Sequence, residues 1–74
     1  MNTPTHPQDA PNIGACLKVI REGAGLSLSE LARRVGKDKS TISRFESGER
    51  AISDEARASI LRAIADHLLE ERAA

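Results

Sequence analysis

The sequence predicts an all-α fold, a compact domain of four to five helices, and three observations lead to this prediction. Four stretches place apolar residues three and four positions apart, as along one face of a helix. Residues that cap helices precede these stretches, and glycines follow the first three of them. No run shows the two-residue alternation of a β-strand. With 74 residues the chain can build one small domain around a single core.

The first helix is expected to begin after a short tail. Residues 1–11 contain three prolines among polar residues and no Lys or Arg, which predicts a disordered N-terminal tail that does not bind phosphate. Asn12 is a good cap for a helix that opens the folded domain, residues 12–74. Glycines at positions 23 and 25 end this helix. Its expected apolar stripe consists of Ile13, Cys16, Leu17, Ile20 and Ala24.

Two short helices follow. Ser27 and Glu30 have the spacing of a capping box, in which each side chain bonds to the backbone amide of the other residue. Gly36 ends this second helix, because glycine readily adopts the left-handed conformation. The expected buried face is formed by Leu28, Leu31, Ala32 and Val35. Asp38 then caps a third helix, which buries Ile42 and Phe45 and ends at Ser47-Gly48.

Ser53 caps the final helix, whose first turn carries Asp54 and Glu55. Neither Gly nor Pro interrupts the chain from Asp54 to about Glu71, so one long helix is expected, with a bend near residues 65–66 as the alternative. Its broad apolar face consists of Ala56, Ile60, Leu61, Ile64, Ala65, Leu68 and Leu69.

Composition argues against several classes of function. Phe45 is the one aromatic residue, whereas proteins that hold single-stranded nucleic acid stack bases on several rings. Cys16, His6 and His67 lie far apart in the sequence, so neither a metal site nor a cysteine nucleophile is expected. No spacing suggests catalysis or a cofactor, and we expect no enzyme. The absence of disulfides and of a secretion signal predicts a cytoplasmic protein.

The net charge of zero is unevenly distributed along the chain. Residues 1–50 carry a net charge of +2, and residues 51–74 carry −2. An anionic partner is therefore expected to bind the first part of the chain.

Residues 27–47 have the pattern of a helix-turn-helix. Ala32 is a small residue at which a second helix can cross, and Gly36 lies in the turn four positions later. Ile42 and Phe45 supply two large apolar anchors one turn apart.

With these residues in place, the sequence resembles the Cro and phage-repressor family of helix-turn-helix proteins, the lambda-repressor-like domains. The resemblance covers most of the chain, from about Ile13 to Leu68. Its most specific parts are the runs Leu-Ser-Leu-Ser-Glu-Leu-Ala-Arg-Arg-Val-Gly at 26–36 and Ser-Thr-Ile-Ser-Arg-Phe-Glu-Ser-Gly-Glu-Arg at 40–50. It implies a sequence-specific transcriptional regulator that places its third helix in the major groove of double-stranded DNA.

The resemblance also implies roles for individual residues. The base-facing positions are Lys39, Ser40 and Arg44, flanked by Thr41 and Ser43, and a structural or phosphate role for Thr41 is an equal alternative. The expected phosphate contacts are Ser27, the Leu28 amide, Lys37, Ser47, the Gly48 amide and Arg50. Arg33 and Arg34 either contact phosphate or face solvent. The family commonly pairs an arginine and a glutamate that correspond to Arg21 and Glu46, so a partly buried ion pair is expected.

Two positions depart from the family pattern. Asp38 stands where family members often carry Ser or Thr; it is expected to cap equally well but to place a carboxylate near phosphate. The usual proline after the recognition helix is absent, and Ala51-Ile52-Ser53 stands there instead.

The last helix has more apolar surface than one neighbour can cover, which suggests a homodimer that reads a palindrome. The expected interface is formed by Leu68 and Leu69, with Ile64 or Ile52. A repressor is the commonest role for a domain of this family that stands alone. The alternative is an antitoxin or another protein-interaction module that binds a protein partner through the last helix.

Overall fold

The computed structural model describes residues 12–73, and within this range it contains four helices and no strand. The helices are α1 (Ile13–Gly23), α2 (Leu28–Val35), α3 (Lys39–Ser47) and α4 (Asp54–Ala73). The predicted all-α fold class is therefore confirmed. The predicted tail at 1–11 lies outside the described residues.

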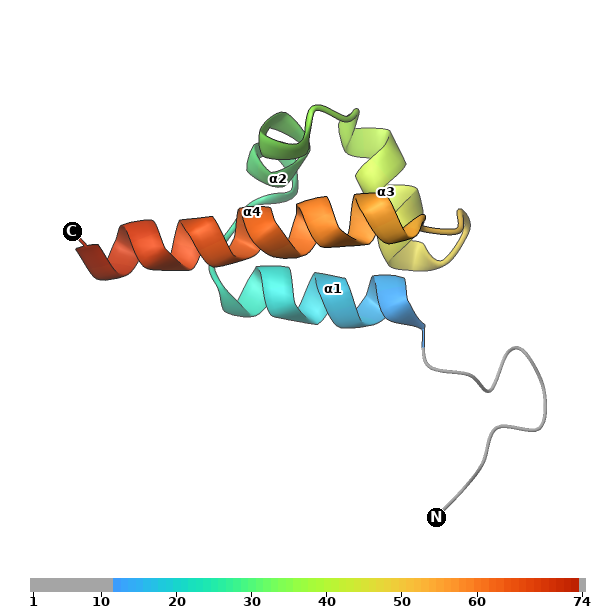
Figure 1. Cartoon of the computed structure of the whole chain (residues 1–74). Helices are drawn as coiled ribbons and strands as arrows, with labels where there is room; N and C mark the ends of the chain where they lie inside the picture. Colours follow the sequence, from blue (N-terminus) through green and yellow to red (C-terminus); the bar gives the residue numbers. More distant parts are fainter. Residues whose placement is uncertain (1–11, 74) are drawn as a thin grey trace, which may run out of the picture.

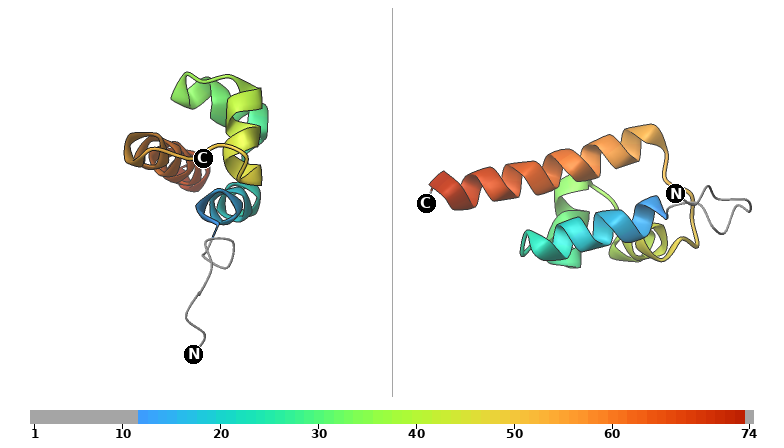
Figure 2. Two further views of the ribbon diagram at one scale, coloured as in Figure 1. Left: turned by 90° about the vertical axis from the view of Figure 1, so that its right-hand side faces the viewer. Right: turned by 90° about the horizontal axis from the view of Figure 1, so that it is seen from below.

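The two longest helices, α1 and α4, lie side by side and run in the same direction, while α2 and α3 pack against them (Figure 1). Figure 2 shows from other directions that α4 and α3 lie on different sides of the molecule, each beside α1, and that the C-terminal turns of α4 extend past the other helices. The core between the four helices consists of Leu17, Ala24, Leu26, Leu31, Ala32, Ile42, Phe45, Ala56, Ile60, Ala63 and Ile64.

Side-chain caps define the starts of three helices. The Asn12 carboxamide accepts a hydrogen bond of 3.2 Å from the Ala15 amide, and the Ser27 hydroxyl accepts one of 3.1 Å from the Glu30 amide. The Ser53 hydroxyl does the same at the start of α4, at 3.0 Å from the Ala56 amide. Each bond satisfies an amide that has no partner inside its helix.

The inner face of α1 differs from the predicted stripe. Leu17 and Ala24 are buried as expected, but Ile13 and Ile20 are 43% and 46% exposed, and Cys16 is also exposed. The cause is a close approach between two backbones: a Cβ on Gly14 would lie 1.7 Å from the carbonyl oxygen of Phe45 in α3. Only glycine fits there, and α1 consequently turns Gly14, Leu17 and Arg21 inward.

The final helix is a single helix from Asp54 to Ala73, as the first of the two alternatives predicted. Its buried residues are Ala56, Ile60, Ala63 and Ile64. Part of the predicted apolar face lies outside the core, because Leu61, Leu68 and Leu69 are exposed. One side of α4 packs on α1 and α2, and these leucines stand on its outer side.

Candidate nucleic-acid interface

The turn between α2 and α3 is fixed by backbone bonds and by a left-handed glycine. Gly36 has φ of 68°, and the Lys37 amide donates a 3.0 Å hydrogen bond to the Ala32 carbonyl. Ala32 itself is buried, and Leu31 and Ile42 have no exposed surface. The two helices of the helix-turn-helix are thus locked at a fixed angle by a small residue, a glycine turn and apolar anchors.

A buried ion pair fixes α3 to α1. The Arg21 Nε donates to Glu46 Oε2 at 2.7 Å, and Arg21 Nη2 donates to Glu46 Oε1 at 3.0 Å. The third nitrogen, Nη1, donates to the Leu26 carbonyl at 2.8 Å. Both side chains are less than a tenth exposed. The hydrogen bonds with Glu46 raise the pKa of the Arg21 guanidinium, and the pair holds the C-terminal end of α3 in place.

The outer face of α3 carries the residues that the resemblance assigned to base contact. Lys39, Ser40, Ser43 and Arg44 are exposed and follow one another at helical spacing, opposite the buried Ile42 and Phe45. Thr41 is half-buried at the edge of this face. The face presents donors from two cations and from two hydroxyls.

Of the cations that have no ion-pair partner within residues 12–73, four lie on or beside α3, while Lys18 lies on α1 and Arg62 and Arg72 lie on α4. Within residues 12–73, ion pairs to carboxylates are formed by Arg21, Arg33, Arg34 and Arg57. No carboxylate in the same range pairs with Lys37, Lys39, Arg44 or Arg50, which all lie between the end of α2 and the loop after α3. These four side chains are exposed. Their charges are therefore available to an anionic partner.

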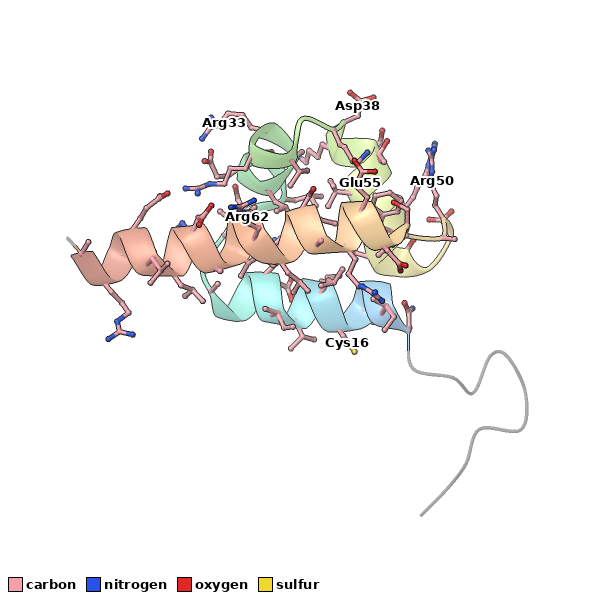
Figure 3. All side chains as sticks on the ribbon, viewed as in Figure 1. Cys16, Arg33, Asp38, Arg50, Glu55 and Arg62 are labelled. Atoms are coloured by element: carbon pink, nitrogen blue, oxygen red, sulfur yellow. The ribbon has the colours of Figure 1, made fainter. Side chains whose placement is uncertain are left out.

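Arg50 is positioned by two contacts. Its guanidinium carbon lies 6.0 Å from the centroid of the Phe45 ring, which is within range of a cation–π interaction. Its amide also donates to the Arg44 carbonyl at 3.2 Å. In Figure 3 the Arg50 side chain projects outward from the loop that follows α3. Its charge is thus held near the C-terminal end of α3, beside the Phe45 ring.

The expected phosphate contacts of the backbone differ at the two ends of the helix-turn-helix. At the start of α2, the Leu28 amide lies in the first turn, where amides have no partner inside the helix. After α3, the Gly48 amide is already bonded to the Phe45 carbonyl at 3.2 Å. The Ser47 hydroxyl lies 3.1 Å from the Arg44 carbonyl and 2.9 Å from the Glu49 carboxylate. The amide predicted at Gly48 is consequently occupied by the end of its own helix.

Arg33 and Arg34 take part in an ion-pair network. The Arg33 side chain also faces solvent, as one of the two alternatives predicted, whereas the Arg34 side chain is largely covered. Both donate to the Glu30 carboxylate, and Arg34 also donates to Glu70 in α4 at 2.7 Å and 3.0 Å. The hydrogen bond from Arg33 is the main reason that the pKa of Glu30 falls to about 2. Glu30 therefore turns to the arginines, and only the Ser27 half of the expected capping box is formed. This network joins α2 to the far end of α4.

The residues expected at a dimer interface are divided between core and surface. Ile64 is 2% exposed and belongs to the core, so it cannot contact a second chain, and Ile52 packs against the core. Leu68 and Leu69 are 42% and 61% exposed. In the described part of the chain, the exposed large aliphatic residues all lie on α1 and α4: Ile13, Val19, Ile20, Leu61, Leu68 and Leu69.

Two further findings concern residues 12–73. None of the four helices is both long enough and apolar enough to cross a membrane. No group of three or more His, Cys, Asp or Glu side chains in this range is arranged so that it could hold a metal ion.

Comparison with known proteins gives one match to a family. The model of a family described as a helix-turn-helix domain matches residues 12–73, which is nearly the whole chain. Neither the curated proteins nor the solved structures contain a match.

Proposed function

Since this chain belongs to the helix-turn-helix domain family, we propose that it is a transcriptional repressor. The family lies in the group that includes Cro and the phage repressors, and DNA binding is the activity of that group. The protein binds a palindromic operator as a homodimer, with α3 in the major groove. The observation that carries this proposal is the outer face of α3, where donors and unpaired cations gather and no large apolar side chain is exposed.

Base recognition is assigned to the outer face of α3. The Arg44 guanidinium has the fork of donors that matches O6 and N7 of guanine, and Lys39 supplies a donor of the same kind at the start of the helix. The Ser40 and Ser43 hydroxyls can donate or accept, and the Thr41 side chain is partly available at the edge. Because Ile42 and Phe45 anchor the opposite face, these side chains keep a fixed register.

Phosphate contacts are assigned to the flanks of the same surface. Lys37 and Arg50 place unpaired positive charges on either side of α3. Ser27 and the Leu28 amide lie at the positive end of α2, where a phosphate is favoured by the helix dipole. Ser47 reaches a phosphate only if its hydroxyl leaves Glu49. These contacts provide affinity that does not depend on sequence.

The decisive experiment compares the effects on DNA binding of replacing two arginines, one on α3 and one on α4. Arg44 and Arg62 are both exposed and both lack an ion pair within residues 12–73, but Arg62 lies on α4. Operator duplexes are first selected from random DNA with the unchanged protein. Arg44→Ala is expected to weaken binding by about 1–3 kcal/mol and to relax the preference at one base position. Arg62→Ala is expected to leave both unchanged. Equal effects of the two substitutions on operator binding would refute the assignment of α3.

The dimer is proposed to form through the exposed leucines of α4. Leu68 and Leu69 are exposed and belong to the C-terminal part of α4. The C-terminal turns of α4 extend past the other helices, away from α3 (Figure 1). The chain has no net charge, so electrostatic repulsion between two copies is weak. Pairing there leaves both α3 faces free to bind half-sites about 34 Å apart.

Sedimentation equilibrium tests the dimer. In the absence of DNA, we expect a species of twice the chain mass of 8.0 kDa. Leu69→Glu is expected to convert this dimer to monomer without loss of helicity. A monomer at all concentrations, alone and on operator DNA, would rule the dimer out.

The same two leucines favour a second candidate, a protein-interaction module such as an antitoxin that binds a partner through α4. In that case the unchanged protein is monomeric alone, and Leu69→Glu abolishes capture of the partner but not binding to DNA.

A further inference from the structure

One of the four helix starts lacks its cap bond. Asn12, Ser27 and Ser53 each bond to an amide in the first turn of the helix that follows. Asp38 occupies the same position before α3, with φ of −71° and ψ of 146°, yet its side chain makes no cap hydrogen bond. Aspartate caps helices as well as asparagine and serine do. The prediction that Asp38 would cap α3 is therefore wrong, although its backbone has the required conformation.

The free carboxylate lies at the leading end of the surface assigned to DNA. Asp38 is exposed and directly precedes Lys39, the first residue of α3. In Figure 3 it projects outward from the turn between α2 and α3, on the opposite side of the molecule from Cys16. Within residues 12–73 it forms no ion pair, even though Lys37 and Lys39 are its neighbours in sequence. All of its acceptor capacity is open to an external donor.

The chemistry of a carboxylate limits which donor that can be. An ionised carboxylate only accepts hydrogen bonds, and the phosphates of DNA offer it none. In the major groove, guanine presents two acceptors and thymine presents a carbonyl oxygen and a methyl group. Adenine presents an amino group next to the acceptor N7, whereas cytosine presents its N4 amino group alone. Cytosine is thus the base whose groove edge suits Asp38 best.

We propose that Asp38 determines part of the operator sequence by accepting a hydrogen bond from N4 of a cytosine in each half-site. This inference rests on the proposed function, because it requires α3 to lie in the major groove. Through this contact the Asp38 carboxylate favours binding to the operator, whereas its negative charge alone would be repelled by the phosphates. A short polar side chain with no bond to its own helix is already free to make this contact.

The test uses Asp38→Ala and Asp38→Asn, with Asp66→Ala as a control that removes an exposed acidic side chain from α4. Each protein is titrated with the selected operator and with duplexes in which each position is changed to every other base pair. For the unchanged protein, replacing the cytosine is expected to weaken binding about 5- to 150-fold. Asp38→Ala is expected to abolish that preference at this position alone. Asp38→Asn is expected to shift it toward adenine, because a carboxamide matches N6 and N7 of adenine. Asp66→Ala should keep the original profile.

Other outcomes overturn the inference in distinguishable ways. If Asp38→Ala strengthens binding to all duplexes by the same factor, the carboxylate acts only by repulsion. If Asp38→Ala keeps the preferences of the unchanged protein, Asp38 does not touch a base. If the unchanged protein recovers no preferred sequence, the proposed function fails as well. Because Asp38 makes no cap bond, the thermal unfolding of Asp38→Ala is expected to match that of the unchanged protein, and a lower midpoint would show that it does cap α3.

Discussion

Removing Glu46 is expected to destabilise the domain more than any surface substitution. In Glu46→Ala the Arg21 guanidinium loses the partners of two of its nitrogens and keeps only the Leu26 carbonyl. A cation whose side chain is 8% exposed then keeps a single nearby carboxylate, that of Glu22, which lies 4.0 Å from Nη2 and is itself more than half exposed. Breaking a buried pair by removing one partner costs about 3–5 kcal/mol. A domain of about 60 residues has a total stability of roughly 3–9 kcal/mol, so the loss consumes a large share of it.

Urea unfolding followed by helical circular dichroism measures this loss. Glu49→Ala is the matched control, because Glu49 is exposed and its carboxylate bonds only to the Ser47 hydroxyl within residues 12–73. The midpoint is expected to fall sharply for Glu46→Ala and to stay within about 0.5 kcal/mol of the unchanged protein for Glu49→Ala.

A double substitution separates the stranded charge from lost packing. Arg21→Met combined with Glu46→Leu removes both charges, and buried pairs replaced in this way often regain or exceed the original stability. Recovery should be incomplete here, since the Leu26 carbonyl loses its donor. The reasoning is refuted if Glu46→Ala unfolds like Glu49→Ala, or if the double variant is less stable than Glu46→Ala.

Three more predictions follow from contacts of the folded domain. Gly14→Ala should destabilise it by about 1–3 kcal/mol in urea, because the new methyl group meets the Phe45 carbonyl, whereas Gly23→Ala, with nothing within 4 Å, should not. The hydrogen bonds from Arg34 lower the pKa of Glu70, so the ionised carboxylate stabilises the fold above its unfolded pKa of 4.5, and this stabilisation is lost as the pH falls through the lower folded pKa. The decline in stability on acidification should therefore be shallower in Glu70→Gln. An unchanged acid profile would contradict this. Arg50→Ala should weaken binding to all DNA sequences alike and reduce the slope of log affinity against log salt by about 0.9, and an unchanged slope would exclude a phosphate contact.

The sequence predicts the helix ends well because they depend on local chemistry. Asn12, Ser27 and Ser53 cap the helices that follow them, and Gly36 ends α2 in the left-handed conformation. Each of these features is decided within about four residues. The all-α class and the single α4 follow from the same kind of signal.

Features that depend on contacts between helices are predicted less well. The spacing of large apolar residues predicts that Ile13 and Ile20 face the core. In the structure both are exposed, because the backbone of α3 lies so close to α1 that Gly14 faces it instead. The bond from Arg34 to Glu70 joins residues 36 positions apart, and no local spacing reveals it. The bonds that Arg33 and Arg34 donate to Glu30 explain why Glu30 does not complete its capping box.

The candidate site shows the same division. The outer face of α3 could be placed from helical spacing and from the resemblance, and it is exposed as expected. Whether a polar group is free could not be predicted, because that depends on neighbours in space. The Gly48 amide proves to be bonded to Phe45, whereas the Asp38 carboxylate is unbonded.

The close contact between Gly14 and the Phe45 carbonyl has a mechanical consequence for reading DNA. Together with the pair between Arg21 and Glu46 two turns further along α1, it ties the C-terminal turn of α3, at Phe45 and Glu46, to α1. A recognition helix held in this way cannot move its C-terminal turn away from α1 to follow an irregular groove. The duplex must then deform to meet the protein, so we expect operators to be ranked partly by the flexibility of base steps that no side chain touches.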